Sequence, residues 1–152
     1  MQMILKSNKS ALEKAVDYLS IRDYSVKQLR DKLYRCSYDE QEINEALEKL
    51  KARHYLDDAQ LCARQAQVYL REERYSIKAL QFKLLAKGFS SEIVNNCLTA
   101  DFTEYEKRAV IKILPSRLRK TTDREKNMQY LYRKGFSVAS IRYGIDKLLK
   151  EE

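Results

Sequence analysis

The sequence predicts an all-α protein: three tandem three-helix repeats that form an elongated, curved array. Glycine and proline are scarce, with three and one among the 152 residues, which argues against an all-β fold because such folds need frequent turn residues. Residues that can cap helices recur through the whole chain, and two short motifs occur twice. Together these observations favour a chain of similar helical units.

The two repeated motifs relate the three parts of the chain to one another. The segment Tyr24–Leu29 (Tyr-Ser-Val-Lys-Gln-Leu) is matched by Tyr75–Leu80 (Tyr-Ser-Ile-Lys-Ala-Leu), 51 positions later. The segment Lys87–Ser90 (Lys-Gly-Phe-Ser) is identical to Lys134–Ser137, 47 positions later. We therefore expect one unit in three imperfect copies. The predicted division is a tail over residues 1–9 and repeats over residues 10–55, 56–101 and 102–152.

Nine residues are placed to start helices. A capping side chain accepts a backbone N–H of the first turn, and a Glu or Gln three positions later completes a capping box. In chain order, the predicted N-caps are Ser10, Ser25, Asp39, Asp57, Ser76, Ser90, Thr103, Thr122 and Ser137. The sequence therefore predicts nine helices in three sets of three.

Apolar residues with helical spacing follow these caps and are predicted to form the core. They include Ile43, Ala46, Leu47 and Leu50 in the third helix, Leu61, Cys62, Ala66, Val68 and Tyr69 in the fourth, Leu80, Leu84 and Leu85 in the fifth, and Val138, Ile141, Ile145, Leu148 and Leu149 in the ninth. One unit of about 45 residues is too small to bury a stable core alone, so neighbouring repeats should dock.

Glycine and proline mark the ends of three predicted helices. Gly88 and Gly135 follow the fifth and eighth helices, where a left-handed C-cap residue is expected. Pro115 is predicted to end the seventh helix and to begin a connection that runs through Ser116 to Thr121.

The charge of the chain favours a polyanionic partner, such as nucleic acid or an acidic protein groove. The formal net charge is +8 at pH 7. Residues 103–152 contribute most of it, with 13 Lys and Arg against 7 Asp and Glu. The N-terminus has no apolar run long enough for a signal peptide or a membrane span, so a cytoplasmic protein without membrane contact is expected.

The residue types and their spacing give little support for an enzymatic function. The single histidine, His54, is expected to cap a helix C-terminus, and Asp57 and Asp58 fit an N-cap and a first-turn charge. The three cysteines, Cys36, Cys62 and Cys97, lack zinc-ligand spacing and fit a reducing compartment. With three glycines there is no phosphate-binding loop, so we expect no catalytic residues, no metal and no cofactor.

At this point the residues resemble a known family. The run Tyr55-Leu56-Asp57-Asp58, then Leu61 and Ala63, then Leu80, Leu84 and Lys87-Gly88-Phe89, resembles the core of the RecX family of bacterial regulatory proteins. The third unit, with Arg133-Lys134-Gly135-Phe136-Ser137 and Ile141, is similar to the last repeat of that family. The resemblance covers residues 10–150. The first unit departs from it, because Arg35-Cys36-Ser37-Tyr38 replaces the Lys-Gly-Phe turn.

The resemblance implies three tandem three-helix repeats, a cytoplasmic location and no enzymatic activity. It also implies the RecA recombinase as partner, which family members modulate, usually as inhibitors, from the helical groove of the RecA–DNA filament. The family has no catalytic residues to carry over. Its matching positions, Leu56, Asp58, Ala63, Leu84, Gly88, Gly135 and Phe136, are interpreted as architecture. A monomer that functions in DNA repair, recombination and the SOS response is expected.

Basic residues are the candidate contacts to such a partner. They are Arg64, Arg71, Arg74, Lys78, Lys107, Arg108, Lys112, Arg117, Arg119, Lys120, Arg124, Lys126 and Arg133. In the third unit, Tyr130, Tyr132 and Tyr143 lie among basic residues, and arginine beside tyrosine suits both protein hot spots and phosphate contact. For any single residue the alternative is a solvated helix face.

Three classes of function stay open at the level of the sequence. The first is a regulator that docks in the RecA filament and touches protein and phosphate. The second is a DNA-binding protein that acts without RecA, because short helices joined by tight turns resemble helix-turn-helix units. The third is a helical-repeat adaptor for another protein.

Overall fold

The computed structural model describes residues 8–149 and confirms the all-α class. Within this range it contains nine helices and no strand. The helices are α1 (Ala11–Ile21), α2 (Val26–Arg35), α3 (Glu40–Ala52), α4 (Asp58–Glu72), α5 (Ile77–Ala86), α6 (Ser91–Cys97), α7 (Thr103–Leu118), α8 (Arg124–Arg133) and α9 (Val138–Leu148). The predicted tail over residues 1–9 lies outside the described residues except for Asn8 and Lys9.

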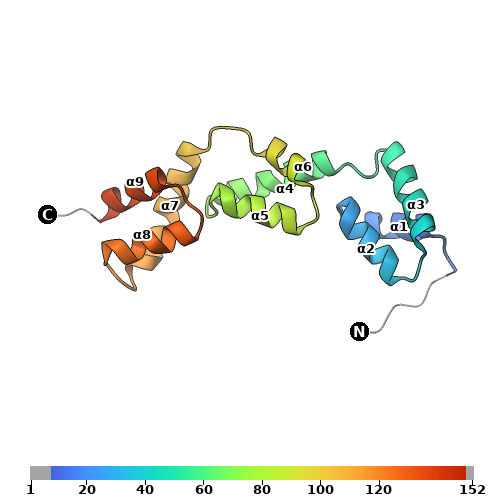
Figure 1. Cartoon of the computed structure of the whole chain (residues 1–152), viewed down its shortest axis with the longest axis horizontal. Helices are drawn as coiled ribbons and strands as arrows, with labels where there is room; N and C mark the ends of the chain where they lie inside the picture. Colours follow the sequence, from blue (N-terminus) through green and yellow to red (C-terminus); the bar gives the residue numbers. More distant parts are fainter. Residues whose placement is uncertain (1–7, 150–152) are drawn as a thin grey trace.

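The helices form three consecutive groups along an arch, with α1–α3 and α7–α9 at its opposite ends (Figure 1). The buried apolar residues also fall into three clusters, one from α1–α3 with Leu56, one from α4–α6 and one from α7–α9. The elongated, curved array predicted from the sequence is therefore confirmed. The boundaries of the repeats at residues 10–55, 56–101 and 102–152 stay a prediction.

Most of the predicted caps are confirmed. Seven side chains accept a backbone N–H of the first turn as expected: Ser10, Ser25, Asp39, Asp57, Ser76, Ser90 and Ser137. The predictions for Thr103 and Thr122 were wrong. Phe102 occupies the N-cap of α7 without a side-chain bond, and Asp123 caps α8 by accepting from the Lys126 N–H. Both threonines have a neighbouring aspartate, Asp101 or Asp123, that accepts local N–H groups instead.

Pro115 does not end the seventh helix as predicted. It lies inside α7, which continues to Leu118, and the Arg119 N–H donates to the Pro115 carbonyl at 3.3 Å. Proline removes one backbone donor but keeps its acceptor, so the helix can continue beyond it. In consequence Arg117 belongs to α7, and only Arg119 and Lys120 follow the helix.

Three residues assigned to core stripes are instead exposed: Val68, Leu85 and Val138. The physical reason is the small number of neighbours. A group of three helices covers only one stripe of α5 and of α9, centred on Leu84 and Ile145, which are fully buried. Apolar residues beside that stripe face water.

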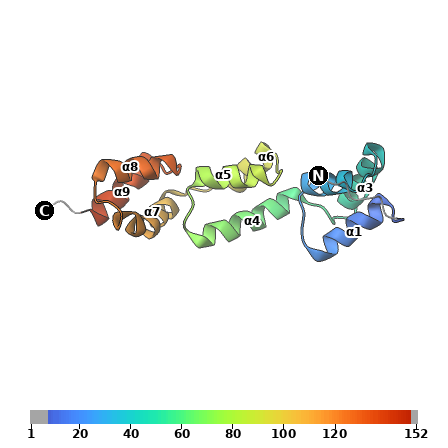
Figure 2. The same ribbon diagram turned by 90° about the horizontal axis from the view of Figure 1, so that it is seen from below.

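The middle helices of the three groups stack end to end. Figure 2 shows α8 and α5 in line along the array. The Ser76 hydroxyl at the start of α5 donates to the Lys134 carbonyl at the end of α8, at 2.7 Å. The Ser25 hydroxyl at the start of α2 donates to the Lys87 carbonyl at the end of α5, also at 2.7 Å. Each capping serine thus satisfies a carbonyl of the next helix, and the helix dipoles align head to tail.

Gly88 and Gly135 end α5 and α8 in the predicted left-handed conformation, each with φ +96°. Each glycine also lies against the next repeat. A Cβ on Gly88 would lie 2.8 Å from the Lys27 Cβ, and a Cβ on Gly135 would lie 2.6 Å from the Ser76 hydroxyl oxygen. The first unit has Ser37 at this place, with φ 70°. Glycine at residues 88 and 135 therefore serves both the turn and the docking of repeats.

Replacing Gly135 by alanine should lower the free energy of unfolding by about 1–2 kcal/mol from the left-handed backbone alone, with a further loss from the contact with Ser76. Urea unfolding followed by circular dichroism measures this. The control is Ala139→Gly, which makes the reverse exchange of alanine for glycine at an exposed position in the first turn of α9. An unchanged midpoint for Gly135→Ala would contradict the tight docking of α8 on α5.

Candidate functional site

A groove with a volume of about 740 Å³ lies where the second and third groups of helices meet. Four helices and their ends contribute to it: α4, α5, α7 and α8. The lining residues are Glu72, Arg74, Tyr75, Ser76, Ala79, Lys112, Ile113, Ser116, Tyr130, Lys134 and Phe136. We call this the inter-repeat groove. It holds three cations and a single carboxylate.

Two of the three cations of the groove, Lys112 and Lys134, are held in place without an ion pair. The Lys112 ammonium donates to the Glu72 backbone carbonyl at 2.6 Å. The Lys134 ammonium lies over the Tyr130 ring, 5.4 Å from its centre. Among residues 8–149, the ion pairs include no carboxylate bound to Arg74, Lys112 or Lys134. The groove therefore presents uncompensated positive charge in a recessed surface.

A second groove occupies the equivalent place between the first and second groups. Its volume is about 410 Å³, and Arg22, Asp23, Leu61, Arg64, Gln65, Val68 and Lys87 line it. Arg64 on α4 corresponds to Lys112 on α7, and Lys87 at the end of α5 corresponds to Lys134 at the end of α8. In this copy Arg64 pairs with Asp23 at 3.4 Å. The basic groove is thus a feature of the repeat.

Tyrosine rings hold a lysine of the second helix in the first and second groups. In the second group, Tyr69 and Tyr75 meet edge to face at 5.6 Å, and Lys83 lies over both rings, 5.7 and 4.7 Å from their centres. The first group has the same arrangement with Tyr18, Tyr24 and Lys32. Contacts of this kind contribute about 0.5–1 kcal/mol at exposed sites and leave the charge available.

The third group keeps this contact with the two partners exchanged. Arg117 stands where Tyr69 stands in the second group, and Tyr130 stands where Lys83 stands. The Arg117 guanidinium lies 4.7 Å from the centre of the Tyr130 ring. The first and second helices are therefore joined by a contact between a cation and a ring in both repeats, although neither position keeps its residue type.

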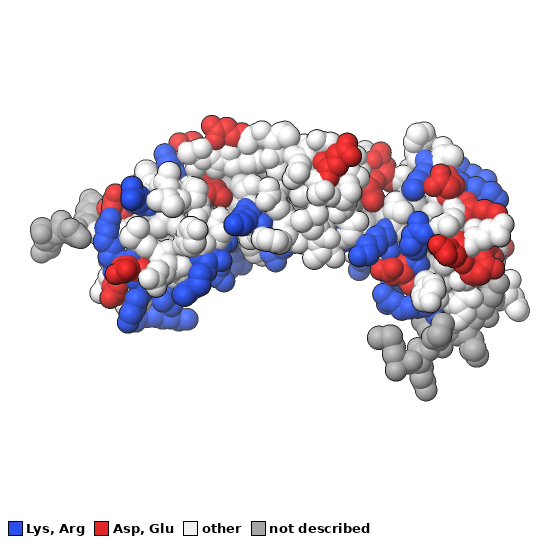
Figure 3. Space-filling model, in the orientation of Figure 1, with Lys and Arg blue, Asp and Glu red and all other residues white. Residues whose placement is uncertain are grey.

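The basic side chains gather on the inner side of the arch. Figure 3 shows Lys and Arg along the lower, hollowed edge of the molecule, over both of its ends, while white and red side chains dominate the upper edge. Acidic side chains lie among the basic ones at both ends, but positive charge dominates this long surface, which favours a long partner of the opposite sign.

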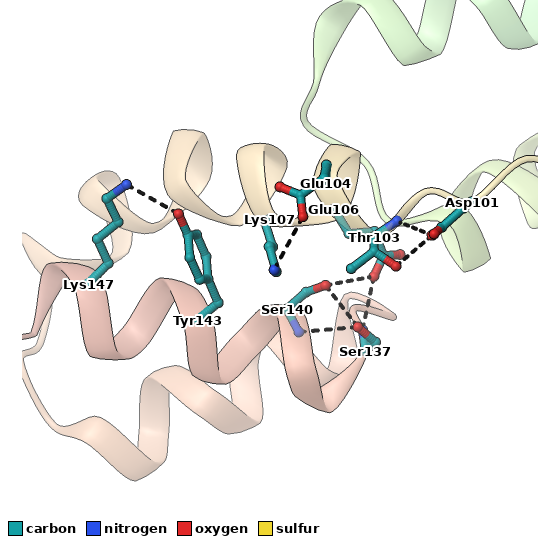
Figure 4. A network of polar contacts seen from close by, with 9 residues as sticks. All are labelled: Asp101, Thr103, Glu104, Glu106, Lys107, Ser137, Ser140, Tyr143 and Lys147. Carbon is teal, nitrogen blue, oxygen red and sulfur yellow. Dashed lines mark hydrogen bonds and ion pairs between the residues drawn. The ribbon is translucent and has the colours of Figure 1, made fainter.

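A buried carboxylate, Glu106 of α7, fixes the junction beside the groove (Figure 4). It accepts the Ile77 N–H at the start of α5 at 3.0 Å and the Ser137 N–H at the start of α9 at 3.1 Å, and the Ser140 hydroxyl lies at 3.4 Å. Glu106 thus joins two repeats and does not complete a capping box with Thr103. Asp58 has the equivalent place at the other junction, where it accepts the Val26 N–H at 3.0 Å.

Burial changes the acidity of two groups at these junctions. Desolvation raises the pKa of Asp58, although the Val26 N–H opposes this by favouring the charged carboxylate. Desolvation also raises the pKa of Tyr105 to about 12, so at neutral pH its hydroxyl keeps its proton and donates to the Tyr75 carbonyl at 2.8 Å. This bond ties α7 to the rim of the inter-repeat groove.

The structure divides the candidate residues predicted from the sequence. Arg74 and Lys112 line the inter-repeat groove, and Arg64 lines the second groove. Arg117 lies over the ring of Tyr130, which itself lines the inter-repeat groove. Three others pair with carboxylates: Lys107 with Glu104, Arg108 with Glu73, and Arg124 with Asp146. The remaining candidates, Arg71, Lys78, Arg119, Lys120, Lys126 and Arg133, are exposed and lie outside both grooves.

The sequence analysis did not include Lys87 or Lys134 among the candidate contacts, although Lys134 is one of the basic residues that lie beside Tyr130 and Tyr132. Both lysines begin a Lys-Gly-Phe-Ser motif, in which Gly88, Gly135 and Phe136 were interpreted as architecture. The signal that could have identified them is the position itself. A lysine before a C-cap glycine that docks on the next repeat must lie at a junction between repeats.

Within the described part of the chain, no helix is long and apolar enough to cross a membrane. The fold places the chain in the class of helical-repeat proteins, which present extended concave surfaces. The family model described as RecX, first three-helix domain, matches residues 11–50.

Similar proteins agree with that match. "Regulatory protein RecX" of Prosthecochloris aestuarii is 28% identical over 147 residues, which cover 93% of this chain and 95% of the relative. The protein of the same name from Bacillus licheniformis is 30% identical over 135 residues, which cover 85% of this chain and 51% of the relative. The chain thus spans nearly all of the first relative and about half of the second.

Two crystal structures share the fold. One, described as regulatory protein RecX, has a TM-score of 0.79 at 22% identity and covers 90% of this chain and 70% of its own. The other, RecX from Lactobacillus salivarius, has a TM-score of 0.78 at 23% identity and covers 91% and 94%. The family model, the relatives and the two crystal structures together support the RecX family of regulatory proteins for this chain.

Proposed function

We propose that this protein modulates the RecA recombinase, in the direction of inhibition, by lying in the groove of the RecA–DNA filament. The observation that carries the proposal is the basic groove, present at both junctions of an elongated arch. A partner that fits such a surface is long, regular and polyanionic, as a protein filament on DNA is. The protein acts in the cytoplasm as a monomer, without catalytic residues or cofactor of its own.

The experiment is RecA-dependent ATP hydrolysis on single-stranded DNA, with this protein added in substoichiometric amounts. The expected result is a fall in the rate of hydrolysis, because one bound molecule that spans several filament subunits disturbs more than one of them. A rate that does not respond over a wide range of concentrations would contradict the proposal and favour the adaptor function.

The uncompensated cations of the groove also favour a second candidate, a DNA-binding protein that acts without RecA. Titration on short duplex and single-stranded DNA distinguishes the two. Strong sequence-specific binding with RecA unaffected supports the second candidate. Weak binding that falls steeply with salt supports the first, because phosphate contacts release counterions.

A further inference from the structure

A second kind of hollow lies on the third repeat, away from the inter-repeat groove. It has a volume of about 310 Å³ and lies between α8 and α9. Its lining residues are Met128, Gln129, Tyr132, Arg133, Val138 and Ile141. We call it the α8–α9 hollow. Four of its six side chains are apolar or aromatic, and none carries a carboxylate.

Two of the side chains that line the α8–α9 hollow are large and apolar but do not belong to the buried core of the third repeat. Tyr132 is 66% exposed and Val138 is 50% exposed. The packing of α8 on α9 uses Leu131, Ile141 and Ile145, all of which are buried. Single exposed apolar residues are ordinary, but a group of them around a hollow marks an interaction site.

The other repeats expose apolar residues at the equivalent positions. Leu85 on α5 and Tyr34 on α2 correspond to Tyr132 on α8, and both are exposed, as is the neighbouring Phe82. The middle helices of all three repeats thus expose an apolar side chain at the same position. In the third repeat a hollow lies beside this side chain, where a partner's side chain can enter.

Charge complementarity identifies the partner. Lys126, Gln129 and Arg133 are three and four residues apart on α8, so they share one face beside the hollow. Within residues 8–149 neither Lys126 nor Arg133 is paired with a carboxylate. An apolar hollow with cations on its edge suits a protein segment that carries a bulky apolar residue next to carboxylates.

We propose that the α8–α9 hollow receives a bulky apolar side chain of a protein partner, while flanking carboxylates of that partner pair with Arg133 and Lys126. This rests on the proposed function, under which the partner is a protein subunit of the RecA filament. The apolar lining disfavours the phosphate backbone of the filament's nucleic acid as occupant. The two surfaces then have separate tasks: the inter-repeat groove meets phosphate, and the α8–α9 hollow meets protein.

The test compares two tyrosines of equal exposure. Tyr132→Ala removes a wall of the hollow, and Tyr55→Ala removes a tyrosine that is also 66% exposed but lies between α3 and α4. The assay is inhibition of RecA-dependent ATP hydrolysis. We expect Tyr132→Ala to raise the concentration for half-inhibition about tenfold or more, as loss of an aromatic anchor does, and Tyr55→Ala to leave it unchanged.

Second variants separate the chemistry of the hollow from a general loss of structure. Val138→Ser makes the opposite wall polar at an exposed position and should act in the same direction as Tyr132→Ala. Arg133→Glu should weaken inhibition strongly while Arg133→Lys retains most of it, because a carboxylate partner tolerates either cation. Circular dichroism of each variant should match the parent protein, since the altered side chains lie outside the core.

The outcomes distinguish this inference from the function on which it rests. If the parent protein inhibits RecA and Tyr132→Ala, Val138→Ser and Arg133→Glu inhibit equally well, the hollow is not the contact and the function still stands. If Tyr132→Ala weakens binding to a single-stranded oligonucleotide without RecA as much as it weakens inhibition, the occupant is nucleic acid and the inference is wrong. If the parent protein does not affect RecA at all, both proposals fall.

Discussion

Replacing Glu106 by alanine is expected to lower the free energy of unfolding by about 2–6 kcal/mol. The carboxylate is 8% exposed and accepts the N–H groups of Ile77 and Ser137, which begin helices in two different repeats. Without it two partly buried backbone donors lose their acceptor, and each such loss costs about 1–3 kcal/mol. Equilibrium urea unfolding, followed by circular dichroism, measures the change.

Two controls make this result specific. Glu104→Ala alters an exposed glutamate in the same turn of α7 and should change the free energy of unfolding by no more than about 0.5 kcal/mol. Glu106→Gln keeps an acceptor oxygen at the junction and should cost less than alanine. If Glu106→Ala and Glu104→Ala unfold at the same urea concentration, water replaces the carboxylate and the junction does not depend on it.

The sequence predicted those parts of the fold that depend on neighbours along the chain. The caps at Ser25 and Ser76 are determined by residues within three positions, and the glycine ends of α5 and α8 by a single turn. The prediction of Thr103 as an N-cap was wrong because the contact that decides it joins residues far apart in the sequence. Glu106 lies at the right spacing for a capping box, but its carboxylate is used by Ile77, 29 positions earlier.

The candidate site could be predicted only as a list of cations. The sign of a charge is a property of a single residue, so Arg74, Lys112 and Arg108 all qualified. Whether a cation is neutralised depends on contacts between distant residues: Arg108 pairs with Glu73, 35 positions away, while Lys112 meets only a backbone carbonyl. The groove itself arises from the docking of two repeats, which no local pattern specifies.

Tyr69 and Lys83 of the second repeat are replaced by Arg117 and Tyr130 in the third. This exchange shows a further limit of prediction from the sequence. A repeat search compares residue types position by position, and at these two positions the second and third repeats differ completely. The physical contact is nevertheless the same, because a cation–ring pair is equally favourable from either helix. Similarity of interaction can therefore exceed similarity of sequence.

Reversing the charge at both Lys112 and Lys134 is expected to raise the concentration for half-inhibition of RecA-dependent ATP hydrolysis by on the order of a hundredfold. The double variant Lys112→Glu/Lys134→Glu turns two of the three cations of the inter-repeat groove into carboxylates. Like charges placed against a polyanion cost several kcal/mol. If the groove meets phosphate, the dependence of inhibition on salt should also become less steep, because fewer counterions are released.

The matched control for this variant changes the net charge by the same amount outside the groove. Arg119→Glu/Lys120→Glu alters two exposed cations that follow α7 and are among the candidate contacts predicted from the sequence. We expect it to weaken inhibition far less, since long-range attraction between exposed charges is screened at physiological salt. Equal losses in the two double variants would show that overall charge, and not the inter-repeat groove, determines the interaction with the filament.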